Sequence, residues 1–220
     1  MKLNEEQNRE IEGYLETKGV YQIDLKYEIL DHITSGVENS MENQGFNFQK
    51  SFELEQTKWQ AELNSLKISK YNIDFKTPKI VLRRYWAVIR EMYTKAFVMT
   101  LGAFMSIFIF VKSGMVPAES FNTVFGYFYL TAFIIIALSF LKMKSDDTNT
   151  VDKMIFKTTM GYFMAWLIVF NPLLTQMYWV FQAGEVMIVF LTIHSFLMCF
   201  SFNFMDLYKN HRKKMKMYSL

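Results

Sequence analysis

The sequence predicts an all-α protein, with a small cytoplasmic three-helix module followed by a four-helix transmembrane bundle. Charge divides the chain, because residues 1–75 carry a net charge of −6 and residues 76–220 a net charge of +9. Four apolar runs follow residue 90, and each approaches the roughly 20 residues that cross a hydrocarbon core of about 30 Å. The 22 Phe, 12 Tyr and 4 Trp residues argue against a disordered chain.

Four segments follow from this division. We expect a cytoplasmic helical module over residues 1–76, a basic amphipathic juxtamembrane helix over 77–95, a four-span membrane domain over 96–208 and a basic cytoplasmic tail over 209–220. The first ten residues have no apolar core, so no cleavable signal peptide is expected.

The acidic module reads as three amphipathic helices. The first is expected after Asn4, a favourable N-cap, and is expected to stop at Gly19. The second is expected from about Tyr21 to Gly45, with apolar residues recurring at alternating spacings of four and three. The third is expected from about Asn47, with a stripe of Phe48, Phe52, Trp59, Leu63 and Leu66. No alternation typical of a strand is evident in residues 1–70.

The basic junctions predict the orientation of the four spans. Lys and Arg gather before the first run, between the second and third runs and after the fourth, whereas the other two loops carry almost none. Basic loops stay on the cytoplasmic side of a membrane. We therefore expect a multi-pass protein of the bacterial inner membrane, with both termini cytoplasmic and the lipid bilayer as one partner.

Six residues near the predicted membrane surface are candidates for contact with lipid headgroups. Segment 77–95 mixes Arg with aromatic and aliphatic residues, and it reads either as a helix along the inner leaflet or as a continuous extension of the first span. The C-terminal tail adds a basic run that suits anionic lipid better than nucleic acid. The candidates are Arg83, Arg84, Trp86, Arg90, Lys213 and Lys214.

The N-terminal module also resembles a known signalling domain. The matching residues are Glu28, Leu30, Asp31, His32, Glu38, Gly45, Phe48 and Phe52. Over about residues 10–60 this pattern is similar to the HAAS domain of bacterial membrane proteins. The resemblance implies a PadR-like transcriptional regulator as a partner, with Glu28, Asp31, His32 and Glu38 as partner-binding residues. The acidic surface argues against direct binding of nucleic acid.

Two polar features lie inside the predicted spans. His194 lies near the centre of the fourth span, where an ionisable residue suggests proton or redox chemistry. A neutral histidine that bonds a neighbouring helix is the simpler interpretation. The pair Asn171–Pro172 interrupts the third span, as a packing kink or as a break that exposes backbone to a substrate.

Enzyme chemistry finds little support in the sequence. Cys199 is the single cysteine, and no phosphate-binding loop, nucleophile elbow or zinc motif is present. Residues 145–152 lack the spacing, glycine and closing glutamate of a calcium loop. We therefore expect no catalytic residues, no cofactor and no metal.

Three hypotheses about function follow. The first is a non-enzymatic signalling adaptor or accessory factor, which binds a cytoplasmic or membrane protein through its N-terminal module. The second is a structural subunit of a larger membrane complex for secretion or transport. The third is a small transporter that uses His194 and the Asn171–Pro172 kink.

Overall fold

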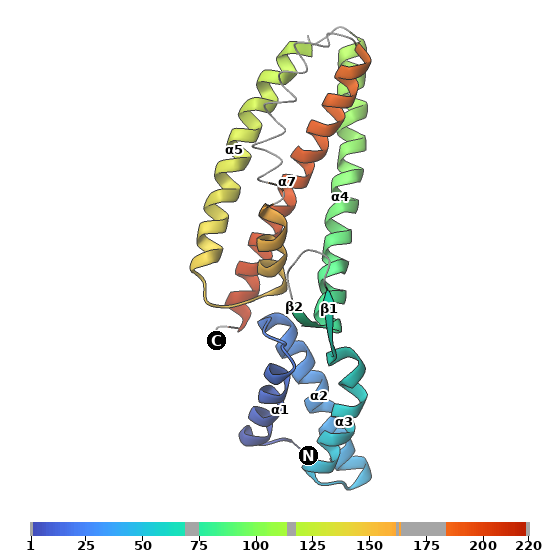
Figure 1. Cartoon of the computed structure of the whole chain (residues 1–220), viewed down its shortest axis with the longest axis vertical. Coiled ribbons are helices and arrows are strands. Elements are labelled where there is room, and N and C mark those ends of the chain that lie inside the picture. The colour runs from blue at the N-terminus through green and yellow to red at the C-terminus, as the bar shows by residue number, and fades with distance from the viewer. Residues whose placement is uncertain (1, 69–74, 114–117, 162, 164–183, 219–220) are drawn as a thin grey trace. The chain divides into compact units, whose positions relative to one another are not determined.

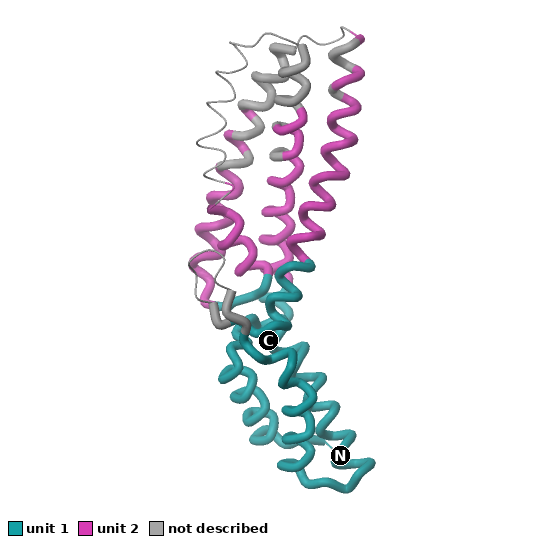
Figure 2. The backbone as a smooth tube through the Cα atoms, turned by 45° about the vertical axis from the view of Figure 1, so that its right-hand side comes forward, with its two compact units in different colours: residues 1–87, 148–151, 214–220 teal, residues 88–147, 152–213 magenta. Residues whose placement is uncertain are grey.

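A computed structural model of the chain describes residues 2–68, 75–113, 118–161, 163 and 184–218. Helices dominate these residues, as the sequence predicts (Figure 1). The chain divides into two compact units (Figure 2). The first unit comprises residues 1–87, 148–151 and 214–220, and the second comprises residues 88–147 and 152–213.

Helix α1, Glu5–Thr17, opens the first unit with a capping box. The Asn4 side chain accepts from the Gln7 amide at 2.9 Å, and the Gln7 side chain accepts from the Asn4 amide at 2.9 Å. Two amides of the first turn are thereby satisfied. The helix ends at Lys18, and Gly19 follows with φ of 84°. Both ends agree with the sequence prediction.

Helices α2, Ile23–Gln44, and α3, Phe48–Leu63, complete the helical core of the first unit. Gly45 ends α2 in the left-handed conformation, which glycine adopts without steric cost. Asn47 then caps α3 by accepting from the Lys50 amide at 3.0 Å. The core is built from apolar residues at helical spacing: Ile11, Leu15, Leu25, Ile29, Ile33, Val37, Phe52 and Leu63.

A pair of short strands follows α3, and the sequence analysis missed it. Strand β1, Ser65–Ile68, pairs antiparallel with β2, Phe75–Pro78, with Leu66 opposite Thr77. Leu66 was expected on the stripe of the third helix, but α3 stops at Leu63. Four residues are too few for an alternating pattern to be separated from the tail of a helical one.

Most of the second unit comes from helices α4, Lys79–Lys112, α5, Ala118–Ser145, and α7, Gly184–Tyr218, together with helical residues 152–161. Aromatic rings fill its core. Phe156 and Phe204 are fully buried and meet edge to face with ring centroids 5.3 Å apart. The Asn203 side-chain amide donates to the Met92 carbonyl at 3.3 Å, which ties α7 to α4.

The transmembrane part of the predicted fold class is wrong. Among the residues that the structure describes, no helix has both the length and the apolar character that crossing a membrane requires. The four-helix transmembrane bundle, the four-span domain and the multi-pass localisation in a bacterial inner membrane, with both termini cytoplasmic, are corrected accordingly.

The prediction relied on the length of apolar runs in the sequence. In the structure, charged residues share two of these helices, over the first half of α4 and the last third of α7, whereas residues 121–141 of α5 carry none. Most of the third run, which contains Asn171–Pro172, lies within residues 164–183, outside the described part of the chain.

Candidate functional site on the N-terminal helices

One face of α2 is exposed over most of the length of the helix. The face that packs into the core carries Ile29, Ile33 and Val37, which are fully buried. On a helix of 3.6 residues per turn, the residues that lie on another side form a separate stripe. This exposed stripe, which we name the α2 face, consists of Glu28, Asp31, His32, Ser35, Asn39 and Glu42.

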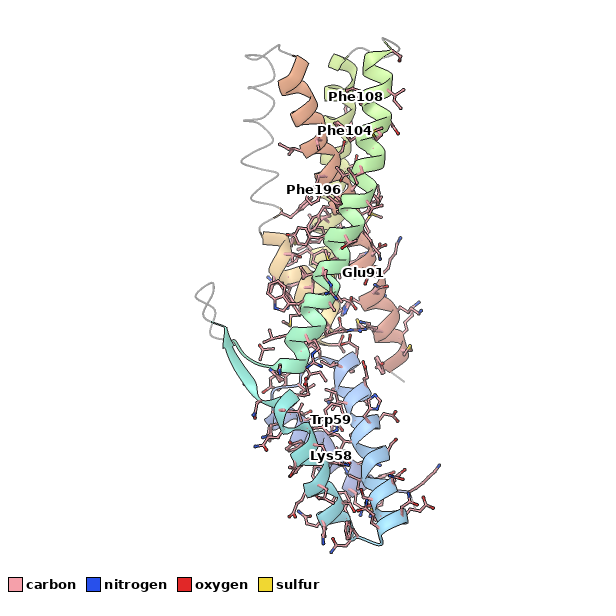
Figure 3. All side chains as sticks on the ribbon, turned by 90° about the vertical axis from the view of Figure 1, so that its right-hand side faces the viewer. Lys58, Trp59, Glu91, Phe104, Phe108 and Phe196 are labelled. Atoms are coloured by element: carbon pink, nitrogen blue, oxygen red, sulfur yellow. The ribbon has the colours of Figure 1, made fainter. Side chains whose placement is uncertain are left out.

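Trp59 of α3 borders the α2 face. Its ring lies 6.3 Å from the His32 imidazole, centroid to centroid, with an interplanar angle of 32°. Figure 3 shows Trp59 beside Lys58 on α3. The two rings add an aromatic edge to a surface that is otherwise acidic and polar.

Close packing of α3 on α2 explains this aromatic contact. A Cβ atom on Gly36 would lie 2.5 Å from the carboxyl carbon of Glu55, so glycine leaves the space that the Glu55 side chain fills. Glu55 is buried, and its carboxylate pairs with Lys58. A larger residue at position 36 would have to displace this carboxylate.

Glu38 lies apart from the other three predicted partner-binding residues. It is half-buried and accepts from the Leu3 amide at 2.8 Å, which holds the N-terminal segment against α2. Glu28, Asp31 and His32 are exposed and lie together on the α2 face. The sequence pattern does not separate Glu38 from them, because its hydrogen-bond partner is 35 residues away.

Helix α1 covers another side of α2 through ion pairs. Lys26 lies 2.6 Å from the Glu12 carboxylate and 3.2 Å from that of Glu16. Burial alone would lower the pKa of Lys26, but hydrogen bonds and charge attraction from the two carboxylates raise it above its ordinary value. The ammonium therefore stays charged and holds the two helices together.

The N-terminus of α2 forms a second polar cluster within the first unit. Asp24 is only 8% exposed, accepts from the Val151 amide at 3.1 Å and pairs with Lys214 at 2.6 Å. The Ile23 amide donates to the Asn149 carbonyl at 2.7 Å. A carboxylate at this end of a helix is also favoured by the helix dipole. Residues 148–151 and Lys214 are therefore anchored to α2.

An aromatic stack lies on the same helix. The rings of Tyr27 and Tyr218 are 5.1 Å apart and inclined by 13°. Sequence reasoning missed both contacts between α2 and the C-terminal residues. The helix dipole alone explains an acidic residue in the first turn of a helix. The sequence around Asp24 therefore does not indicate that its partner is Lys214, 190 residues away.

The residues expected at a lipid surface take different positions. Lys214 binds Asp24, and Arg83 lies 2.6 Å from the Glu62 carboxylate. The remaining four are exposed: Arg84, Trp86, Arg90 and Lys213. Trp86 is 57% exposed. Two of the six basic or aromatic candidates thus contact carboxylates of the first unit.

The two polar residues of the predicted spans fall wholly or partly outside the described residues. His194 belongs to α7, and its side chain lies outside the described part of the chain, as does the whole of Asn171. Among the described residues, no group of His, Cys, Asp and Glu is arranged to hold a metal ion. Cys199 is buried, and this burial raises the pKa of its thiol while a hydrogen bond with Thr100 opposes the shift.

Comparisons of the chain with protein-family models, with curated proteins and with solved structures return no match. The α2 face is therefore interpreted from its own chemistry.

Proposed function

We propose that the chain is a non-enzymatic adaptor that holds a protein partner on the α2 face. The observation that carries this proposal is a division among the acidic residues of the first unit. Glu12, Glu16 and Glu62 form ion pairs with lysine or arginine, and so do Asp24 and Glu55. The described acidic residues of this unit that are exposed and outside these pairs include Glu5, Glu6, Glu10, Glu28, Asp31 and Glu53. Of these, Glu28 and Asp31 lie one turn apart on the α2 face, beside His32 and Trp59. Their charge is therefore available to a second molecule.

The chemistry of the face suggests a partner with a basic surface. Opposite charges across an interface speed association and set the orientation of the two proteins. Trp59 and His32 add aromatic groups, and tryptophan is enriched among the residues that dominate binding energy. The resemblance to the HAAS domain supports a PadR-like regulator as the first partner to test.

Charge reversal on the full-length chain tests the proposal. We expect the double variant Glu28→Lys with Asp31→Lys to lose at least tenfold in affinity for a partner that co-purifies with the wild-type chain. Measured by titration calorimetry, wild-type binding should also weaken as salt rises, because exposed charges are screened. Far-UV circular dichroism should show unchanged helix content in the variant.

A matched control carries the same change in charge elsewhere on the module. Glu10→Lys with Glu53→Lys alters exposed residues of α1 and α3. The control variant should retain wild-type affinity. A complex that survives the reversal at Glu28 and Asp31 would overturn the proposal and would indicate a subunit held by other surfaces of the chain.

A further inference from the structure

We propose that a cavity in the second unit binds a long hydrocarbon chain. The cavity has a volume of about 680 Å³ and lies among α4, α7 and the residues Thr159 and Phe163. Pockets for small molecules commonly measure 300–1,000 Å³. Six rings among the described residues line this one: Tyr93, Phe97, Phe104, Phe163, Phe196 and Phe200. Figure 3 marks Phe104 on α4 and Phe196 on α7. The proposal does not depend on the adaptor function.

The lining selects an uncharged apolar ligand. Among the described residues, none that lines the cavity carries a charge. The Thr100 hydroxyl donates to the Ala96 carbonyl at 2.6 Å, and the Thr159 hydroxyl donates to the Ile155 carbonyl at 2.7 Å. Both hydroxyls thus have acceptors on their own helices. Thr192 and Tyr93 carry the other two hydroxyls among the described lining residues, and Tyr93 is 52% exposed. A charged or strongly polar group placed there would lose its hydration without replacement.

The lining is also elongated. On α4 it runs from Tyr93 to Phe104, and on α7 from Thr192 to Phe200. At a rise of 1.5 Å per residue, these stretches span about 16 Å and about 12 Å. A flexible chain fits such a shape better than a compact molecule does. Tyr93, at one end, is 52% exposed, so a polar end of the ligand can reach water there.

A fluorescent fatty acid tests the assignment on the purified full-length chain. We expect cis-parinaric acid to bind with a saturable rise in its fluorescence. Leu101 lines the cavity and is 50% exposed, so Leu101→Trp should occupy part of the space without disturbing a buried core. This variant should bind the probe at least tenfold more weakly.

The control variant carries its substitution on the same helix, α4. Met99 is 48% exposed and does not line the cavity. It lies two residues from Leu101, on the other side of α4. Met99→Trp should bind the probe as the wild-type chain does. Binding that does not saturate, or an equal loss in both variants, would overturn the proposal.

Competition separates recognition of the chain from recognition of the carboxylate. Because the lining is uncharged, dodecanol and dodecanoate should displace the probe at similar concentrations. Displacement by dodecanoate alone would show that a cation binds the acid group, and this result too would overturn the assignment.

Discussion

The two units of the chain are stabilised by different chemistry. In the first unit, the buried carboxylates of Asp24 and Glu55 form ion pairs with Lys214 and Lys58, respectively. In the second unit, stacked and edge-to-face rings such as Phe156 and Phe204 fill the interior. Large apolar residues of its helices are exposed: Phe97, Val98, Met99, Leu101, Met105, Ile109, Leu130, Leu138 and Leu141. The first unit should therefore be sensitive to loss of a partner, and the second to loss of volume.

The largest effect is expected from removing a buried ring in the second unit. Phe204 is fully buried and meets both Phe156 and Phe163. Phe204→Ala should lower the free energy of unfolding by about 3–5 kcal/mol, because it removes apolar contacts and leaves a cavity. Denaturant titration followed by tryptophan fluorescence measures this change. Phe202→Ala, at a position 40% exposed, should cost about 1 kcal/mol or less.

An equal cost for the two phenylalanine variants would contradict the stabilising role of the buried rings in the second unit. It would mean that the aromatic interior contributes no more stability than the surface of the same helix.

A smaller loss of unfolding free energy is expected when Asp24 in the first unit is replaced. Asp24→Ala should cost about 1–3 kcal/mol, because the Val151 amide and the Lys214 ammonium both lose their acceptor. A double-mutant cycle with Lys214→Ala isolates the pair. The double variant should cost less than the sum of the two single variants. Strict additivity would show that the ion pair contributes nothing to stability.

The smallest effect concerns pH and His211 in the second unit. His211 is fully buried, and its Nε2 lies 3.2 Å from the Asp146 carboxylate. Burial lowers the pKa of His211 below its ordinary value, and Lys153 lowers it further, while Asp146 and Asp152 oppose the shift. The unfolded chain therefore takes up a proton at higher pH than the folded chain does.

It follows that the contribution of His211 to stability is complete above about pH 6.5 and declines as the pH falls below that value. Melting temperatures measured from pH 8 to pH 5 should show this decline. In His211→Gln this part of the pH dependence should disappear. A wild-type chain that becomes more stable on acidification would contradict the direction of the shift.

The helices of the first unit could be predicted because their signals are local. Asn4, Gly45 and Asn47 each determine a helix end within four residues of themselves. The strand pair β1–β2 could not be predicted, since each strand has only four residues. The transmembrane prediction relied on the length of the apolar runs and on the basic residues between them, and no helix among the described residues is both long and apolar enough to cross a membrane.

The candidate site was partly predictable for the same reason. The spacing of Glu28, Asp31 and His32 places them on one side of any helix that contains them. Trp59 was interpreted only as part of an apolar stripe, and its contact with His32 depends on how α3 packs at Gly36. The roles of Glu38 and Asp24 depend on Leu3 and on Lys214, which lie 35 and 190 residues away.

The ion pair between Asp24 and Lys214 also fixes an order of events during synthesis. A ribosome adds about 5–20 residues per second, so Lys214 is made about 10–40 s after Asp24. The contacts among α1, α2 and α3 can form during that interval, because each helix pairs with the next one along the chain. The first unit therefore begins to fold before the second but is completed only after it.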